Sequence, residues 1–300
     1  MKIAIIGGGA VGLLFASYLQ EENDVILYTR SENQSESIRS NGLVRKNGEE
    51  SICLPINVRP ISQWDENGIE LVILCVKGYM LDGIINNLTF SPTLPLLFVQ
   101  NGMGHLSLLE KINTRSIFIG SVEHGALRVN NHTVSHTGIG VTKLAIYRMV
   151  EGDRWILDKL ILQSIKNFPA QFEQEYMVML KKKLVVNAVI NPITAILGVT
   201  NGSLLTNKSY QMLFEQLFEE VCLALSLERH TYYENLVHVC KNTAINESSM
   251  LKDVKNGRRT EIDAILGYVL EEAQRKEIKV PLTLAFYHCV KGKEIKEEGM

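Results

Sequence analysis

Hydrophobic and polar positions follow one pattern in the first half of the chain and another in the second half. In the first half, short β-branched runs are continuously apolar, as expected for parallel strands that are covered on both faces of a sheet. Helical spacing of apolar residues near 10–22, 78–88 and 104–112 falls between some of these runs. We therefore predict an α/β fold with a doubly wound parallel sheet. The predicted strands are Ile3–Ile6, Val25–Thr29, Leu71–Val76, Leu96–Val99 and Ile117–Ser121.

One segment of the first half departs from this alternation of strands and helices. Asn47 and Gly48 lie between two extended runs, and this dipeptide favours the tight turn of a β-hairpin. We therefore expect a hairpin over Leu43–Leu54, inserted after the second strand.

The strand pattern stops near residue 171, and helical spacing replaces it. The predicted helices lie near 174–198, 207–229, 233–245 and 260–277, and a last one begins at Pro281. We therefore predict an N-terminal α/β domain over residues 1–170 and an all-α C-terminal domain over residues 171–300.

Composition and charge exclude several classes of function. The 300 residues suit one large or two medium domains, and 46% hydrophobic with 21% charged residues is usual for a globular protein. A net charge of −2 gives no basic excess for binding nucleic acid or an anionic membrane. Five cysteines without a C-x-x-C pair fit a reducing compartment better than a disulfide framework. We expect a cytoplasmic protein with no nucleic-acid or membrane partner.

The histidines indicate no metal site. All seven are scattered, with no H-E-x-x-H motif and no cysteine partners. His132 and His136 are four residues apart, but they fall in a predicted strand–turn–strand segment, where this spacing does not make a ligand pair. We therefore expect no metal cofactor.

A glycine-rich turn follows the first predicted strand directly and opens an apolar helix. It matches G-x-G-x-x-G, in which the first glycine permits a tight turn, the second lets the backbone approach a diphosphate, and the third lets the helix pack closely. The N-terminus of such a helix presents free N–H groups to an anion. This setting predicts a Rossmann-type dinucleotide site, and the alternative is a glycine-rich turn without a ligand. The residues concerned are Gly7, Gly8, Gly9, Ala10, Val11 and Gly12.

The end of the second predicted strand bears on which dinucleotide binds. NAD-selective sites carry Asp or Glu about 20 residues after the first glycine, where it holds the ribose 2′-hydroxyl. Here the strand ends in Tyr28-Thr29-Arg30-Ser31, without an acid. A guanidinium can clamp a 2′-phosphate with two charge-assisted hydrogen bonds, whereas a carboxylate would repel it. Arg30 therefore favours NADP(H), with a solvated surface arginine as the alternative.

Two further strand ends carry polar residues where a doubly wound fold binds its ligands. Lys77 follows Cys75-Val76, and Asn101 lies between Gln100 and Gly102. Lys77 could meet a phosphate or a substrate carboxylate, and Asn101 could bond a ribose or the substrate. Turn and helix-cap roles are the alternatives for both.

A stripe of polar residues runs along one face of the first predicted helix of the second half. Lys183, Asn187 and Asn191 are spaced i, i+4, i+8, so they share one helix face among apolar residues. Buried amides need partners, which suggests a polar ligand or a bond between them. Pro192 follows at once and should break the helix ladder near Ala188 and bend the helix. The alternative is a solvated run of three lysines followed by asparagines at a helix end.

These motifs together resemble the ketopantoate reductase (2-dehydropantoate 2-reductase) family over essentially the whole chain. The most specific stretch begins at Lys183, continues through Asn187 to Asn191-Pro192, and ends in Ile193-Thr194-Ala195. The others are the N-terminal glycine motif, Lys77, Gln100-Asn101-Gly102, Ser248-Ser249-Met250-Leu251-Lys252-Asp253, Thr260-Glu261-Ile262-Asp263 and Gly267.

The resemblance implies NADPH-dependent reduction of 2-dehydropantoate to (R)-pantoate, a step towards pantothenate and coenzyme A. It aligns Lys183 with the catalytic lysine of the family. The substrate positions that it implies are Asn101, Lys183, Asn187, Asn191, Asn201 and Ser249. The cofactor positions beyond the glycine turn are Arg30, Lys77, Asn101, Ala126 and Glu261.

The chemistry of ketone reduction assigns roles to these residues. Negative charge builds on the carbonyl oxygen, and a lysine ammonium supplies both a cation and a proton there. Glu261 could hold that ammonium by an ion pair and contact a ribose, so we expect Lys183 and Glu261 as the catalytic residues. Asparagine amides and the Ser249 hydroxyl can hold substrate oxygens without adding charge.

Two other functions remain open from the sequence. One is another NADP-dependent 2-oxoacid or imine reductase on the same scaffold, and the other is a non-catalytic NADP(H)-binding sensor. For a ketopantoate reductase and for the alternative reductase alike, we expect a small-molecule substrate, which is a 2-oxo acid in the first case. We also leave a homodimer open.

Overall fold

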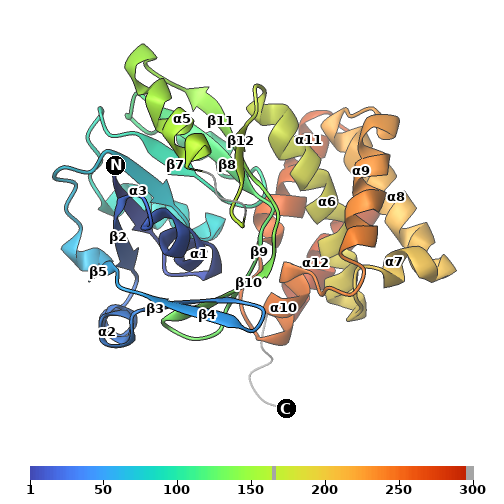
Figure 1. The fold of residues 1–300 in the computed structure, drawn as a ribbon. Helices are drawn as coiled ribbons and strands as arrows, with labels where there is room; N and C mark the ends of the chain where they lie inside the picture. The colour runs from blue at the N-terminus through green and yellow to red at the C-terminus, as the bar shows by residue number, and fades with distance from the viewer. Residues whose placement is uncertain (164–166, 295–300) are drawn as a thin grey trace. The chain divides into compact units, whose positions relative to one another are not determined.

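The computed structural model describes residues 1–163 and 167–294, which form two compact units (Figure 1). The first unit comprises Met1–Gln100 and Ser107–Met179, and the second comprises Asn101–Leu106 and the described residues from Leu180 onward. A short segment from the middle of the chain thus belongs to the C-terminal unit. The division into domains at residues 170 and 171 stays a prediction.

The first unit is built on an eight-stranded sheet with the order β12-β11-β8-β7-β6-β1-β2-β5. Neighbouring strands from β5 to β8 are parallel, which confirms the predicted doubly wound α/β fold. The two strands at the other edge were not among the strands predicted for this sheet, and β11 runs antiparallel to β8. The bounds are β1 Lys2–Ile6, β2 Asp24–Thr29, β5 Asn57–Pro60, β6 Leu71–Leu74, β7 Leu96–Phe98, β8 Ile117–Val122, β11 Thr142–Arg148 and β12 Ala170–Phe172.

The central strands are buried along their whole length, because helices and loops cover both faces of the sheet. Every residue of β6, β7 and β8 is buried, as the continuous apolar runs predicted. Short helices connect the strands in this unit. They are α1 Ala10–Leu19, η1 Ile61–Gln63, η2 Gly78–Met80, α3 Leu81–Asn87, α4 Leu106–Leu109, η3 Glu151–Asp153 and α5 Arg154–Leu162.

A second, four-stranded sheet contains the predicted hairpin. Strands β3 (Leu43–Asn47) and β4 (Glu50–Leu54) pair antiparallel around Gly48, whose φ of +62° fits a tight turn. The hairpin is therefore confirmed, but it does not follow the second strand directly, because helix α2 (Glu32–Asn41) lies between them. Two more strands complete the order β4-β3-β10-β9. Strand β9 (Gly125–Arg128) was not predicted, whereas β10 (Thr133–Gly138) lies in the predicted strand–turn–strand segment that contains His136.

Helices are the only regular secondary structure in the part of the second unit that the structure describes, which confirms the predicted change of class. Its first helix, α6 (Tyr176–Leu197), starts within the last residues of the first unit. The others are α7 Ser203–Thr206, α8 Lys208–Leu225, α9 Arg229–Asn242, α10 Ser249–Lys255, the π-helical turn η4 Asp263–Gly267, α11 Tyr268–Arg275 and α12 Pro281–Glu294. None of the described helices is both long and apolar enough to cross a membrane.

Helix α6 confirms the helix predicted near 174–198. It runs for 22 residues and contains Pro192, and a bend at this proline stays a prediction. Proline has no N–H to donate to the carbonyl of Ala188, but a helix of this length retains its other backbone bonds on both sides. Burial of the neighbouring Ala188, Val189, Ile190 and Ile193 favours the continuous helix as well.

Candidate active site

The predicted glycine-rich turn joins β1 to α1 at the edge of the sheet where the parallel strands end. Gly7 has a φ of +120°, and its N–H donates to the carbonyl of Tyr28 at 2.9 Å. A Cβ on Gly12 would lie 1.8 Å from the carbonyl oxygen of Gly7, so α1 packs closely, as the motif predicts. A Cβ on Gly9 would meet no atom of the described residues within 4 Å. The turn is therefore tight at Gly12 and open at Gly9.

Two side chains hold the middle of this turn. The carbonyl of Gly8 accepts hydrogen bonds from Gln34 Nε2 at 2.8 Å and from Arg128 Nη1 at 3.2 Å. Both side chains also donate to Asn131. Gln34 Nε2 bonds the backbone carbonyl of Asn131 at 3.0 Å, and Arg128 Nη2 bonds its Oδ1 at 2.6 Å. Neither residue was predicted as part of the site from the sequence, because neither belongs to a short motif. Gln34 lies in a polar helix, and Arg128 lies in a strand that was not predicted.

Arg30 directly follows β2 and is exposed. The backbone around it is fixed, since Thr29 Oγ1 donates to the carbonyl of Ser31 at 2.9 Å, and the hydroxyl of Ser31 caps α2. An exposed guanidinium on a fixed strand end can meet a ligand phosphate, but it can also stay in solvent. The 2′-phosphate role of Arg30 therefore stays a prediction.

Three more predicted residues of the first unit lie on separate elements. Lys77 precedes η2 in extended conformation and is half-buried, and Ala126 lies in β9. Gln100 is buried and donates from Nε2 to the carbonyls of Leu74 and Val76 at 2.7 and 3.0 Å. Gln100 thus fixes the residues just before Lys77. A Cβ on Gly7 would also lie 2.9 Å from the backbone nitrogen of Val76, so the glycine turn and the segment before Lys77 are in contact.

In the second unit the structure brings together two predicted residues that are far apart in sequence. Asn101 Nδ2 donates to Glu261 Oε2 at 3.0 Å. The backbone strengthens this contact, since the N–H of Met103 donates to the carbonyl of Ala264 at 3.0 Å. A Cβ on Gly102 would lie 2.2 Å from that same carbonyl, and only glycine allows this approach at a φ of +77°. The predicted Asn101 and Glu261 therefore belong to one cluster.

His105 lies in the same segment and was not predicted. Burial lowers the pKa of its imidazole to about 4, although the carboxylate of Glu261 acts in the opposite direction. The ring is therefore neutral at pH 7.

This burial predicts a pH-dependent stability. In the unfolded chain His105 binds a proton below about pH 6.5, while in the folded chain it does so only near pH 4. Protonation therefore favours the unfolded chain, and the folded state is most stable above about pH 6.5 and loses stability progressively towards pH 4. The loss should reach on the order of 3 kcal/mol, measured as the free energy of unfolding in urea at successive pH values. His105→Gln should flatten this slope, whereas His288→Gln, at an exposed position, should not. An unchanged slope in His105→Gln would contradict the assignment.

The predicted stripe lies on α6. Lys183 and Asn187 are half-buried, and Asn191 is 6% exposed. Lys182 is exposed and Lys181 is half-buried, so the three consecutive lysines have different environments. The continuous helix keeps the predicted i, i+4, i+8 spacing intact along one face.

The last two predicted substrate residues belong to the same unit, Asn201 in the turn before α7 and Ser249 in α10. Asn201 is buried, and its Nδ2 donates to Thr243 Oγ1 at 2.9 Å. Its side-chain oxygen has no hydrogen-bond donor among the described residues. Ser249 is exposed at the start of α10, while Ser248 caps that helix and accepts a bond from Thr194 Oγ1 at 2.8 Å. This bond ties the start of α10 to α6.

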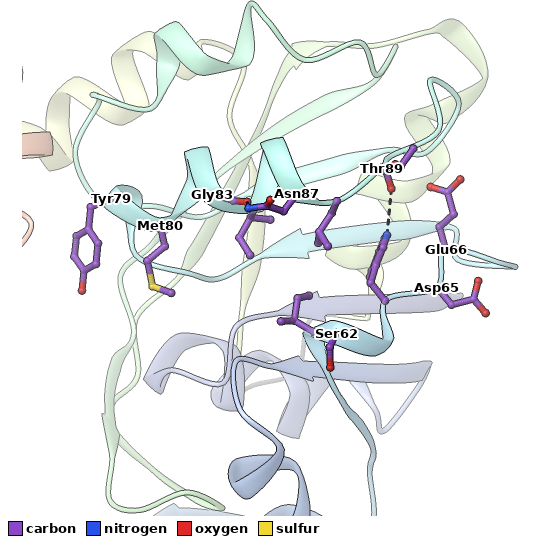
Figure 2. Close-up of a pocket in the computed structure, with 12 residues that line it drawn as sticks. Ser62, Asp65, Glu66, Tyr79, Met80, Gly83, Asn87 and Thr89 are labelled. Carbon is purple, nitrogen blue, oxygen red and sulfur yellow. Dashed lines mark hydrogen bonds between the residues drawn. The ribbon is translucent and has the colours of Figure 1, made fainter.

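A groove of about 930 Å³ in the first unit contains none of the predicted site residues. It lies between η1 and α3 and is lined by Trp64, Tyr79 and Met80 among others (Figure 2). Trp64 forms one wall, packs edge-on against Tyr28, and donates to the carbonyl of Thr89 at 3.1 Å. We therefore locate the candidate active site from the geometry of the glycine turn and the positions of the strand ends, and not from the size of this groove.

The two histidines spaced four apart have separate partners. His132 Nδ1 bonds the hydroxyl of Ser37 at 2.9 Å, and His136 Nδ1 bonds the hydroxyl of Tyr18 at 2.8 Å. His136 also bonds His124, at 3.2 Å. The described residues contain no group of three or more side chains suited to hold a metal ion.

Comparisons with known proteins agree with these features. Residues 3–148 match the family described as ketopantoate reductase PanE/ApbA, and residues 175–294 match its C-terminal counterpart. The 2-dehydropantoate 2-reductase of Bacillus subtilis (strain 168) is 39% identical over 302 residues, covering 98% of both chains. That of Listeria innocua is 36% identical over 297 residues, covering 98% of this chain and 97% of the relative.

Solved structures show the same fold. The crystal structure of a probable 2-dehydropantoate 2-reductase from Bacillus subtilis superposes with a TM-score of 0.88 at 38% identity, covering 98% of this chain and 100% of that one. A D-mandelate dehydrogenase solved with NADH and anilino(oxo)acetate has a TM-score of 0.86 at 24% identity, covering 98% of each chain, and shows the fold alone. With matches to both halves of the family and relatives along its full length, the chain belongs to the ketopantoate reductase family.

Proposed function

We propose that the protein is an enzyme that reduces 2-dehydropantoate to (R)-pantoate with NADPH, in the synthesis of pantothenate and coenzyme A. The observation that carries the proposal is the stripe of Lys183, Asn187 and Asn191 on the unbroken helix α6. The names of the full-length relatives support the substrate and the reaction.

The residues of the first unit fit NADP(H). Gly9 leaves room at the N-terminus of α1, where the first turn of a helix presents N–H groups to a diphosphate. Arg30 supplies an exposed guanidinium at the end of β2 for a 2′-phosphate. We propose that the glycine turn Gly7–Gly12, Arg30, Lys77 and Ala126 hold the cofactor. Asn101 and Glu261, which belong to the second unit, are the other cofactor contacts that we propose.

The residues of the second unit supply acid catalysis and orient the substrate. When bound, the reduced nicotinamide supplies a hydride to the carbonyl carbon. Lys183 donates a proton to the carbonyl oxygen and stabilises the charge that develops there. Glu261 orients the ammonium of Lys183, and Asn101 bonds the carboxylate of Glu261. The remaining substrate contacts that we propose are Asn187, Asn191, Asn201 and Ser249.

Substrate turnover is the direct test of this function. Oxidation of NADPH should be followed at 340 nm with 2-dehydropantoate, and the product should be identified as (R)-pantoate. A panel of other 2-oxo acids and imines tests the alternative of a different reductase on this scaffold. NADPH binding without turnover of any of these compounds would favour the sensor hypothesis instead.

Arg30→Ala should distinguish the two nicotinamide cofactors. Loss of a charged contact to the 2′-phosphate should weaken NADPH binding by about 10- to 100-fold and barely change NADH binding. The measurement is titration of both cofactors by fluorescence or calorimetry. Arg39→Ala, which removes another exposed arginine, from α2, is the control. Equal losses for NADPH and NADH would contradict the role of Arg30.

Three further proposals concern the whole molecule. We propose that residues 1–170 act as the NADP-binding domain and residues 171–300 as the substrate and catalytic domain. We also propose a cytoplasmic location and a homodimer. Fractionation of cells and sedimentation velocity of the purified protein test these last two proposals.

A further inference from the structure

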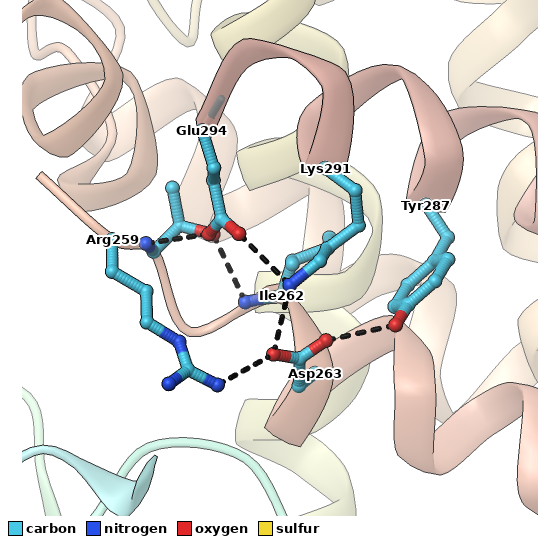
Figure 3. A network of polar contacts seen from close by, with 7 residues as sticks. Arg259, Ile262, Asp263, Tyr287, Lys291 and Glu294 are labelled. Atoms are coloured by element: carbon cyan, nitrogen blue, oxygen red, sulfur yellow. Dashed lines mark hydrogen bonds and ion pairs between the residues drawn. The ribbon is translucent and has the colours of Figure 1, made fainter. Parts of the chain in front are cut away.

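The last turns of α12 hold the segment that carries Glu261 through a network of charged and polar groups (Figure 3). In the figure, Tyr287, Lys291 and Glu294 extend from α12 towards the residues around Ile262. None of these three residues is among the predicted site residues.

Glu294 bonds the residue directly before Glu261. Its Oε1 accepts from the backbone N–H of Thr260 at 2.7 Å and from the hydroxyl of Thr260 at 2.6 Å. The Thr260 hydroxyl accepts in turn from the N–H of Ile262 at 3.2 Å. Thr260 and Ile262 are 1% and 0% exposed, so one carboxylate fixes the buried backbone on both sides of Glu261.

Asp263 forms the second part of the network. It accepts from the Tyr287 hydroxyl at 2.8 Å, from Arg259 at 3.1 Å and from Lys291 at 3.2 Å. Burial would raise the pKa of the Asp263 carboxyl, but these bonds outweigh burial and hold that pKa below its ordinary value. Lys291 also pairs with Glu294 at 2.9 Å, so one ammonium joins both carboxylates.

The segment that these bonds fix includes Glu261, which also contacts Asn101. Glu261 is 8% exposed and accepts from Asn101 Nδ2 at 3.0 Å. The π-helical turn η4 begins two residues later, and such turns occur frequently at functional sites. Residues before and after Glu261 thus bond α12, while the side chain of Glu261 itself bonds Asn101.

We propose that Glu294 is a positioning residue, which sets the backbone at Thr260 and thereby the direction of the Glu261 carboxylate. The inference rests on the proposed function, in which Glu261 orients Lys183 and contacts the cofactor. Without Glu294, the buried N–H and hydroxyl of Thr260 lose their acceptor, and the segment must move to find another. A displacement of Glu261 by about 1 Å would suffice to impair catalysis.

The chain offers a closely matched control at the other end of α12. Glu220 of α8 accepts from the N–H of Thr283 at 2.7 Å, from its hydroxyl at 2.8 Å and from the N–H of Leu282 at 3.0 Å. This is the same carboxylate–threonine arrangement, but its partners belong to the first turn of α12 and not to the Glu261 segment. Glu220→Ala therefore removes similar bonds without affecting Thr260.

The experiment compares Glu294→Ala, Glu294→Gln and Glu220→Ala in the full chain. Hydrogen exchange measures the amides of 260–264, and steady-state kinetics with NADPH and 2-dehydropantoate measures kcat and KM. Glu294→Ala should speed exchange at these amides and lower kcat/KM by about 10- to 100-fold. Glu294→Gln keeps an acceptor oxygen and should recover most of both effects. Glu220→Ala should lower the Tm but leave the exchange of 260–264 and the kinetics nearly unchanged.

Two results would overturn the inference. One is unchanged exchange of 260–264 in Glu294→Ala, and the other is an equal kinetic loss in Glu294→Ala and Glu220→Ala at matched Tm. If the wild-type protein does not turn over 2-dehydropantoate, the proposed function fails separately. In that case the exchange of 260–264 and the affinity for NADPH of the same variants decide the positioning role: both must change in Glu294→Ala and not in Glu220→Ala.

Discussion

Replacing Lys183 by alanine should lower kcat for the reduction of 2-dehydropantoate by at least about 10²–10⁴-fold. The ammonium acts mainly as negative charge develops on the carbonyl oxygen, so kcat and kcat/KM should fall together. Binding of NADPH should survive, because the glycine turn and Arg30 are unchanged. The loss is measured by steady-state kinetics, and cofactor binding by direct titration.

Neighbouring lysines provide the controls for this prediction. Lys182 is exposed, and neither Lys181 nor Lys182 lies on the stripe of Asn187 and Asn191, so alanine at either position should have a mild effect. Lys183→Arg should not recover full activity, because a guanidinium is larger and a far poorer proton donor than an ammonium. A crippling Lys182→Ala together with a harmless Lys183→Ala would show that the catalytic assignment is wrong.

Of two alanine substitutions in the glycine turn, one should strongly lower stability and the other should leave it unchanged. At Gly12 the new Cβ would lie 1.8 Å from the Gly7 carbonyl oxygen, which belongs to the backbone, so α1 or the turn must move. We expect Gly12→Ala to cost more than about 4 kcal/mol of unfolding free energy, or to prevent folding. At Gly9 the new Cβ meets no described atom within 4 Å, and the φ of −79° suits any residue, so stability should be retained.

The same pair separates packing from cofactor binding. Gly9→Ala should fold normally but weaken NADPH binding, since its methyl group occupies the approach of the diphosphate. Urea unfolding and cofactor titration measure the two effects, and Gly83→Ala, whose Cβ is equally unobstructed in α3, is the control for both. A stable Gly12→Ala, or a Gly9→Ala that binds NADPH as the wild type does, would contradict this account of the turn.

The sequence allowed the central sheet to be predicted because its strands are buried on both faces. A continuous apolar run such as Ile3–Ile6 is stable only where both faces of the strand are buried. The observed strand ends differ from the predicted ones by only a residue or two. Helix α2 was missed because it is almost entirely polar, with only Gln34, Ser35 and Ile38 buried. Strand β9 was missed because it has only four residues, and the pairing of its partner β10 with β3 depends on residues far away in the chain.

The candidate site could be predicted where the chemistry requires a particular residue type at a fixed spacing in the sequence. The glycine turn and the stripe on α6 carry that kind of signal, since steric fit and helix periodicity act within a few residues. The bond between Asn101 and Glu261, the burial of His105 and the bonds from Glu294 to Thr260 arise from tertiary packing. No local pattern encodes these contacts, so the structure was needed to find them.

The bonds to the Gly8 carbonyl have a consequence for the energetics of ligand association. Gln34 and Arg128 fix this carbonyl from two different elements, so the turn loses its conformational freedom when the protein folds. A rigid turn forfeits little further entropy when an anion arrives, and preorganisation of this kind strengthens affinity without adding a single contact. The two side chains thus contribute to the binding of a ligand that neither of them needs to touch.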